Sequence, residues 1–197
     1  MYELICIGAS WGGLQAIGRV LADIPDEIEQ PIVIAQHRHP DSMEGTLTDL
    51  LQQQTGRIVV DAEDKAALVA RHVYVAPPSY HLLVERGWLA LSVDEQVQHA
   101  RPSIDVLFES AAHAYGDQAI GIILTGANED GAAGLAEIKR RGGVAVVQDP
   151  AGAVKRSMPD AAIAATVADA VLPLEEIGKF VHGLCLPPAP VREPTEV

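Results

Sequence analysis

Residues 3–13 read Glu-Leu-Ile-Cys-Ile-Gly-Ala-Ser-Trp-Gly-Gly, and this stretch decides the fold of the chain. Its first five residues are mostly apolar and predict a short buried strand, and the apolar spacing from Leu14 onward predicts a helix. A strand, a glycine-rich turn and a helix in succession are typical of a parallel α/β sheet, in which ligands bind at the carboxyl ends of the strands. We therefore expect Ser10, at the apex of a G-x-S-x-G turn, to face a site at that edge.

The rest of the chain alternates between strand and helix patterns. Apolar runs predict strands at residues 31–35, 57–60, 72–76, 119–124, 144–147 and 170–172. Helical spacing predicts helices at residues 14–24, 102–115, 132–141, 158–165 and 174–184, and one that begins at Asp41 or Ser42 and ends at Leu51. Residues 80–92 read as a β-hairpin with its turn at Arg86-Gly87. The sequence thus predicts an α/β fold with a doubly wound, mostly parallel sheet, helices on both faces and an antiparallel β-hairpin at one edge.

Length and composition limit the domain organisation and the kinds of partner. With 197 residues, 48% of them apolar, the chain suffices for one globular domain, which we expect over residues 1–184, followed by a Pro-rich tail at 185–197. A net charge of −13 disfavours nucleic acid and anionic lipid as partners. The sequence has neither a run of about 18 apolar residues, which a membrane span needs, nor a basic start typical of a secretory signal. The two cysteines, Cys6 and Cys185, lack the spacing of a disulfide framework. We therefore expect both to pack in the core of a protein in a reducing, cytoplasmic setting.

A serine nucleophile needs a neighbouring base and an acid that orients the base. His37 directly follows the second predicted strand, and Asp130 lies in the glycine-rich loop after the strand that ends at Leu124. Since the carboxyl ends of parallel strands share one edge of a sheet, Ser10, His37 and Asp130 are predicted to meet there as a triad. Each residue taken alone also fits a simpler role, such as the helix cap that an Asp before Gly131 often provides.

Two other kinds of site fit the sequence less well. A dinucleotide-binding turn needs a glycine where Ser10 stands and an acidic residue at the end of the second strand, where the chain has Gln36-His37. A metal site at His37 and His39 lacks carboxylates or thiols at ligand spacing. We therefore expect neither a cofactor nor a metal.

A series of spaced motifs resembles the catalytic domain of chemotaxis protein-glutamate methylesterases (CheB), over roughly residues 3 to 182. The motifs are G-A-S-W-G-G at 8–13, V-I-A-Q-H at 33–37, V-Y-V-A-P at 73–77, R-P-S-I-D-V-L-F at 101–108, I-L-T-G-A-N-E-D-G-A at 123–132, Q-D-P at 148–150, M-P-D-A at 158–161 and V-L-P-L at 171–174. The resemblance implies that the serine, histidine and aspartate of this family fall on Ser10, His37 and Asp130, which are the residues selected above on chemical grounds.

The resemblance also implies a reaction and its partners. These are hydrolysis of glutamyl methyl esters on the cytoplasmic helices of chemoreceptors, deamidation of receptor glutamines, and an oxyanion hole made by the backbone N–H groups of Trp11 and Ala127. Arg101 either anchors the receptor or braces its own loop. The chain departs from the family at Trp11, where Thr is usual, and at Ala127 and Asn128, which replace Met and Gly. We expect Asn128 to be tolerated there if its φ is positive.

Several alternatives stay open at this point. Trp11 and Ala127 are compatible with a catalytically quiet, methylesterase-like binding module in a chemosensory pathway, and an esterase for a different substrate is a third possibility. The N-terminal receiver domain that is usual in the family is absent from this chain. The sequence therefore represents either an excised catalytic domain or a free-standing form without that switch.

Overall fold

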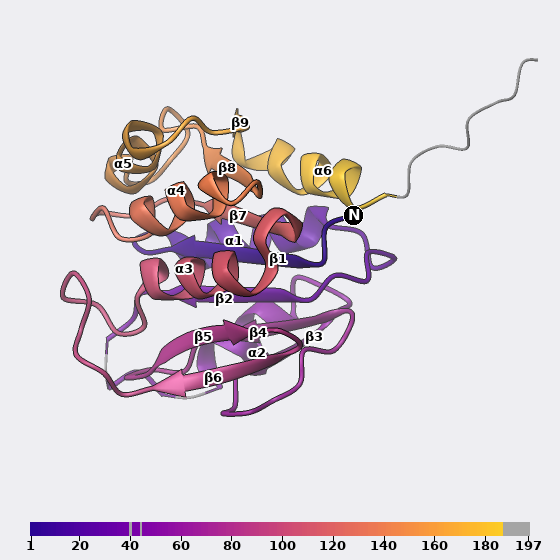
Figure 1. The fold of residues 1–197 in the computed structure, drawn as a ribbon, viewed down its shortest axis with the longest axis vertical. Helices are drawn as coiled ribbons and strands as arrows, with labels where there is room; N and C mark the ends of the chain where they lie inside the picture. The colour runs from indigo at the N-terminus through magenta and orange to yellow at the C-terminus, as the bar shows by residue number, and fades with distance from the viewer. Residues whose placement is uncertain (40, 44, 187–197) are drawn as a thin grey trace, which may run out of the picture.

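A seven-stranded parallel sheet forms the centre of the molecule in the computed structural model, which describes residues 1–39, 41–43 and 45–186 (Figure 1). Its strands are β1 (Leu4–Ala9), β2 (Ile32–Gln36), β3 (Ile58–Asp61), β4 (His72–Val75), β7 (Ala119–Ile123), β8 (Val144–Gln148) and β9 (Ala170–Leu172). They are arranged in the order β3-β4-β2-β1-β7-β8-β9, and every neighbouring pair is parallel. The predicted doubly wound α/β architecture is confirmed.

The strand order places β1 in the middle of the sheet. From β1 the chain first adds β2, β3 and β4 on one side, and it later returns to add β7, β8 and β9 on the other. The direction of winding therefore reverses around β1, and such a reversal opens a crevice at the carboxyl ends of the strands. All six residues of β1 are buried, which agrees with its near-continuous apolar sequence.

Helices cover both faces of the sheet and enclose two hydrophobic cores. In Figure 1, α3 (Ile104–Tyr115) and α4 (Ala132–Arg140) lie in front of the sheet, and their apolar residues share one core with α5 (Ser157–Ala165). The opposite core contains apolar residues of α1 (Gly13–Asp23), α2 (Thr46–Gln52) and α6 (Leu174–Cys185). No helix in the described part of the chain has the length and apolar character to span a bilayer. Of the predicted tail, residues 187–197 lie outside the described residues.

The predicted hairpin forms a two-stranded antiparallel sheet of its own, made of β5 (His81–Glu85) and β6 (Trp88–Ser92). It packs against α3 through Leu82, Val84 and Leu89, which belong to the same core as that helix. The loop of residues 93–103 then leads from β6 to α3. Several of its residues line the same pocket as His37 and Asn128.

Helix α2 begins later than the sequence predicts. The predicted start at Asp41 or Ser42 is wrong, because Gly45 adopts a φ of 78° and interrupts the helical backbone just before Thr46. The Gly45 N–H group donates to Asp61 Oδ2 at 2.8 Å, which ties this turn to the end of β3. The loop after β2 is therefore longer than predicted.

Candidate active site

The candidate nucleophile and the candidate base leave adjacent strands at the same level of the sheet. Ala9 pairs with Gln36 in the parallel register of β1 and β2, and the next residues along the chain are Ser10 and His37. The His37 N–H group donates to Ala9 O at 3.1 Å, and the Ser10 N–H group donates to Thr125 O at 2.9 Å. Neighbouring strands are about 4.8 Å apart. The ends of β1, β2 and β7 therefore form one rim that contains Ser10, His37 and Thr125.

Glycine is required in the turn after Ser10. Gly12 has a φ of 80°, and a Cβ atom there would lie 2.8 Å from the Cβ of Val154. The turn closes through a hydrogen bond from the Gly13 N–H group to Ser10 O at 2.9 Å, and α1 begins at Gly13. This arrangement leaves Ser10 partly exposed at the rim.

His37 and Asp130 form a short, largely buried pair. His37 Nε2 lies 2.6 Å from Asp130 Oδ2, although 93 residues separate the two in sequence. The His37 side chain is 14% exposed, and that of Asp130 is fully buried. Since Nε2 donates to the carboxylate, Nδ1 is left as the nitrogen that can accept a proton.

The Asp130 carboxylate accepts three further hydrogen bonds, all from the start of α3. Ser103 Oγ donates to Oδ1 at 2.8 Å, the Ile104 N–H group to Oδ2 at 2.7 Å and the Asp105 N–H group to Oδ1 at 3.0 Å. Burial alone would raise the pKa of Asp130, but the hydrogen bonds from His37 and from these backbone amides outweigh it and lower the pKa below its usual value. Asp130 is therefore an ionised carboxylate held at a helix N-terminus.

The Ser10 hydroxyl is not hydrogen-bonded to His37 in this structure. In the part of the chain that is described, Ser10 Oγ forms no hydrogen bond, and the polar contact of His37 Nδ1 is with Asn128 Nδ2 at 3.4 Å. The fold thus joins the predicted base to the predicted acid and brings the predicted nucleophile to the same rim. A catalytic role for the three residues remains a prediction.

The two predicted oxyanion donors lie on loops that Thr125 connects. Thr125 Oγ1 donates to Trp11 O at 3.0 Å, so the turn after β1 is fixed to the loop after β7. The backbone N–H groups of Trp11 and Ala127 donate to no acceptor among the described residues. Trp11 itself is 65% exposed and directly follows Ser10 in the turn. We expected Asn128 to be tolerated in place of glycine if its φ were positive. Its φ is not positive, so that expectation does not apply here.

Arg101 braces its own loop. Its Nη1 donates to Val93 O at 2.8 Å and to Asp94 O at 2.9 Å, which closes the loop between β6 and α3. Arg101 also lines a pocket of about 340 Å³ together with His37 and Asn128. These contacts favour the bracing alternative, and an anchoring role for Arg101 remains a prediction.

Sequence reasoning missed three residues of the site. The sequence pattern places Ser103 and Asp105 only at the start of a helix, and it marks Asn128 only as a replacement for glycine. The Ser-Ile-Asp order at a predicted helix start was a usable signal, because such a start presents N–H groups to an anion. No pattern in the sequence indicated that the Asn128 side chain contacts His37.

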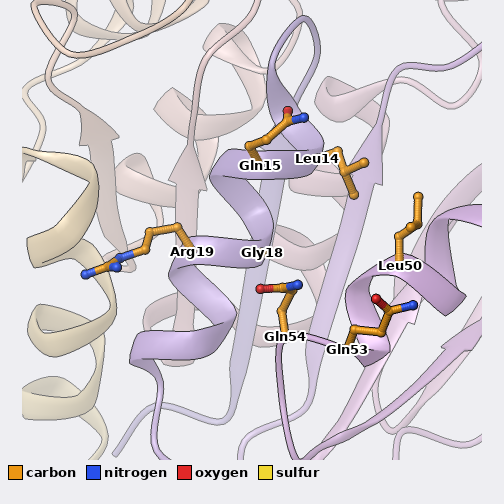
Figure 2. Close-up of a pocket in the computed structure, with 7 residues that line it drawn as sticks. All are labelled: Leu14, Gln15, Gly18, Arg19, Leu50, Gln53 and Gln54. Atoms are coloured by element: carbon orange, nitrogen blue, oxygen red, sulfur yellow. The ribbon is translucent and has the colours of Figure 1, made fainter.

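Another pocket, of about 360 Å³, lies between α1 and the C-terminal end of α2 (Figure 2). Its lining residues are Leu14, Gln15, Gly18, Arg19, Leu50, Gln53 and Gln54. These include none of the predicted catalytic residues, so the chemistry of the rim is separate from this groove.

Comparisons with known proteins agree with this arrangement. The family model described as CheB methylesterase matches residues 5–181. A putative protein-glutamate methylesterase/protein-glutamine glutaminase of Leptospira interrogans is 48% identical over 180 residues, which cover 91% of this chain and 93% of the relative. The protein-glutamate methylesterase FrzG of Myxococcus xanthus is 41% identical, over 90% of this chain and 53% of the relative.

The fold comparison gives the same result. The crystal structure of the Thermotoga maritima CheB methylesterase catalytic domain matches with a TM-score of 0.88 and 29% identity, over 93% of this chain and 99% of the other. The chain spans nearly the whole Leptospira relative and about half of the Myxococcus one. From these matches, the chain belongs to the CheB methylesterase family.

Proposed function

We propose that this protein is a serine esterase that hydrolyses glutamyl methyl esters on chemoreceptors through Ser10, His37 and Asp130. The observation that carries this proposal is the 2.6 Å contact between His37 Nε2 and Asp130 Oδ2 beside the elbow that bears Ser10. The names of the Leptospira and Myxococcus relatives support glutamyl methyl esters of proteins as the substrate, and the resemblance to chemotaxis methylesterases supports chemoreceptors as the proteins that bear them. The Leptospira name also supports a second activity of the same site, deamidation of protein glutamines, which we propose to be those of the receptor.

The proposed reaction begins with attack of Ser10 Oγ on the ester carbonyl carbon. His37 Nδ1 takes the hydroxyl proton as the Oγ–C bond forms, and it then delivers this proton to the departing methoxide, so methanol leaves. Water attacks the acyl-enzyme in the second half of the reaction. Its proton passes through Nδ1 back to Ser10 Oγ, which frees the glutamate carboxylate and restores the site.

Asp130 has an electrostatic role in this scheme. Its carboxylate holds the Nε2–H tautomer of His37, which leaves Nδ1 unprotonated and ready to accept the serine proton. Once His37 is protonated, the adjacent negative charge stabilises the imidazolium. The backbone amides at the start of α3 keep that charge in place, because they lower the pKa of Asp130.

Two backbone N–H groups are available to stabilise the tetrahedral intermediate. Those of Trp11 and Ala127 have no acceptor among the described residues and belong to loops that Thr125 holds together. In serine hydrolases the loss of one such donor typically lowers the rate about 10²- to 10³-fold. Because these donors are main-chain groups, the departures from the family at these two positions change the walls of the site and leave the donors intact.

A serine-directed sulfonyl fluoride tests the nucleophile directly. We expect it to label Ser10 in the wild-type protein and to leave Ser10→Ala unlabelled, with release of methanol from a methylated chemoreceptor fragment lost in the same variant. Ala fits the small-residue turn, so equal thermal unfolding of the two proteins serves as the control for folding. If the wild-type protein is not labelled under conditions that label other serine esterases, the alternative of a binding module replaces the enzyme.

A further inference from the structure

Asn128 makes a direct contact with the proposed base. It is the only asparagine among the 197 residues, and it lies two positions before Asp130 in the loop between β7 and α4. Its Nδ2 is 3.4 Å from His37 Nδ1, which is the nitrogen that Asp130 leaves free. One loop therefore supplies a partner to each nitrogen of the same imidazole ring.

The other end of the Asn128 amide has no partner. Oδ1 is buried and accepts no hydrogen bond in the described part of the chain. A buried carbonyl oxygen without a donor is costly, and in a native protein it calls for an explanation. Here the nearby imidazole offers one, because protonation of Nδ1 would create an N–H group within reach of this amide.

We propose that Asn128 is a positioning residue that serves both protonation states of His37, an inference that rests on the proposed function. In the resting site the amide N–H group donates to the unprotonated Nδ1 and holds the plane of the ring. Before proton transfer the Ser10 O–H group replaces the amide N–H group at the single lone pair of Nδ1. When Nδ1 takes the proton it can no longer accept, and the Asn128 amide turns over so that Oδ1 accepts the new Nδ1–H. Return of the proton to the leaving group restores the first arrangement.

The terminal amide has the freedom and the space to turn. The last torsion of Asn is broad and roughly two-fold, so exchange of Nδ2 and Oδ1 needs no change of backbone. Asn128 lines both the pocket of about 340 Å³ that contains His37 and an adjoining pocket of about 550 Å³ that contains Ala127. Two adjoining pockets thus leave open space beside the side chain.

Other charged and titratable groups around the ring set the background for any pH effect. Asp130 contacts the ring itself, Arg38, His99 and Arg101 line the same pocket, and Glu129 neighbours Asn128 in the chain. Of these groups, Asp130 is hydrogen-bonded to the ring, and Arg38 and Arg101 donate to backbone carbonyls. A test of Asn128 must therefore change its amide and leave all of these side chains in place.

The single asparagine permits a direct spectroscopic test that does not depend on catalysis. Incorporation of ¹⁵N-labelled asparagine gives one side-chain NH₂ pair, and we expect this pair to shift in a single pH-dependent step in the wild-type protein. His37→Gln should abolish that step, because the amide then has no titrating partner. A pair that does not respond to pH, or that responds equally in His37→Gln, overturns the proposal.

Kinetics of two substitutions supply the second test. We expect Asn128→Ala to lower kcat about fivefold to tenfold with KM unchanged, the typical effect of one lost hydrogen bond. Asn128→Asp should move the acidic limb of the kcat/KM profile to higher pH by about one unit or more, since a carboxylate at this distance stabilises the imidazolium. If kcat falls equally in both variants and the acidic limb of the kcat/KM profile of Asn128→Asp does not move, Asn128 has only a structural role and the proposal is overturned.

Gln53→Ala provides the matched control. Gln53 is an amide in the groove between α1 and α2, away from the rim (Figure 2), and we expect its removal to leave kcat and the pH profile unchanged. If the wild-type protein hydrolyses ester, Ser10→Ala does not, and the Asn128 variants behave like Gln53→Ala, the inference on Asn128 alone fails. If the wild-type protein shows no hydrolysis, the proposed function fails, and the ¹⁵N titration still decides whether Asn128 follows His37.

Discussion

Ser103 connects the start of α3 to Asp130. Its Oγ donates to Asp130 Oδ1 at 2.8 Å and accepts the Val106 N–H group at 3.4 Å, so one hydroxyl both caps the helix and holds the carboxylate. Behind it, the Ser103 N–H group donates to Nδ1 of the buried His81 at 3.2 Å. The position of the proposed acid therefore depends on the hairpin and α3 as well as on its own loop.

Removal of the Ser103 hydroxyl should weaken both stability and turnover. We expect Ser103→Ala to lower the free energy of unfolding by about 1 kcal/mol, the usual cost of a lost N-cap. We also expect kcat to fall about tenfold with KM unchanged, because Asp130 loses one of its four donors and holds His37 less firmly. Urea unfolding and steady-state kinetics on a methyl ester measure the two effects. Unchanged kcat at reduced stability would show that Ser103 acts on the helix alone.

Replacement of Trp11 should separate the contribution of its backbone N–H group to catalysis from that of its side chain. Because the residue is 65% exposed, we expect Trp11→Thr to leave the thermal unfolding temperature unchanged. Hydrolysis of a small methyl ester should stay within about twofold of wild type, since the backbone N–H group that would stabilise the oxyanion remains. Hydrolysis of a receptor fragment should change through KM. A loss of kcat on the small ester as large as that on the receptor would contradict this assignment.

The sequence predicted the elements and the edge of the sheet to which Ser10, His37 and Asp130 belong, because both follow from local patterns. Apolar runs mark the strands, and residues that come directly after parallel strands must share an edge, as Ser10 and His37 do through the Ala9–Gln36 register. The same reasoning placed Asp130 at the carboxyl end of β7. The alternation of strands and helices needed no information beyond the periodicity of each segment.

The parts that could not be predicted depend on how loops fold over that edge. The start of α2 is set by the φ of 78° at Gly45, where the sequence offers Asp41 and Ser42 as equally good caps. The contact of Asn128 with His37 joins residues 91 positions apart and is specified by the conformation of two loops. Strand patterns fix which residues reach the rim, and loop geometry decides which side chains touch there.

Substitution of Arg101 tests whether its side chain holds the loop before α3 in place. Its guanidinium spans the carbonyls of Val93 and Asp94. We expect Arg101→Lys to keep the charge and still loosen the loop, because an ammonium lacks the planar fork of donors. Hydrogen exchange at residues 93–101 should therefore quicken in both Arg101→Lys and Arg101→Ala. If exchange is unchanged in both variants while KM for a receptor fragment rises, Arg101 anchors the receptor and does not brace the loop.

Asp105 should make stability depend on pH in a direction opposite to that of most carboxylates. Its side chain is 4% exposed and accepts hydrogen bonds from the Gly134 N–H group at 2.7 Å and from Gln98 Nε2 at 2.9 Å. Burial raises its pKa from 3.8 to about 6, against the effect of the Gly134 hydrogen bond and with a further contribution from the nearby charge of Asp130.

A carboxyl whose pKa is higher in the folded state than in the unfolded state destabilises the fold once it ionises. The penalty is absent below about pH 3.8, grows as the pH rises to about 6, and stays constant above that value at up to about 3 kcal/mol. Asp105→Asn removes the charge and keeps an oxygen for the Gly134 N–H group. We therefore expect the free energy of unfolding of the variant, relative to wild type, to increase between pH 4 and pH 6 and then level off. Urea unfolding across this range measures the difference, with the exposed Asp117→Asn as control, and a difference that does not vary with pH would show that Asp105 is not a strained carboxylate.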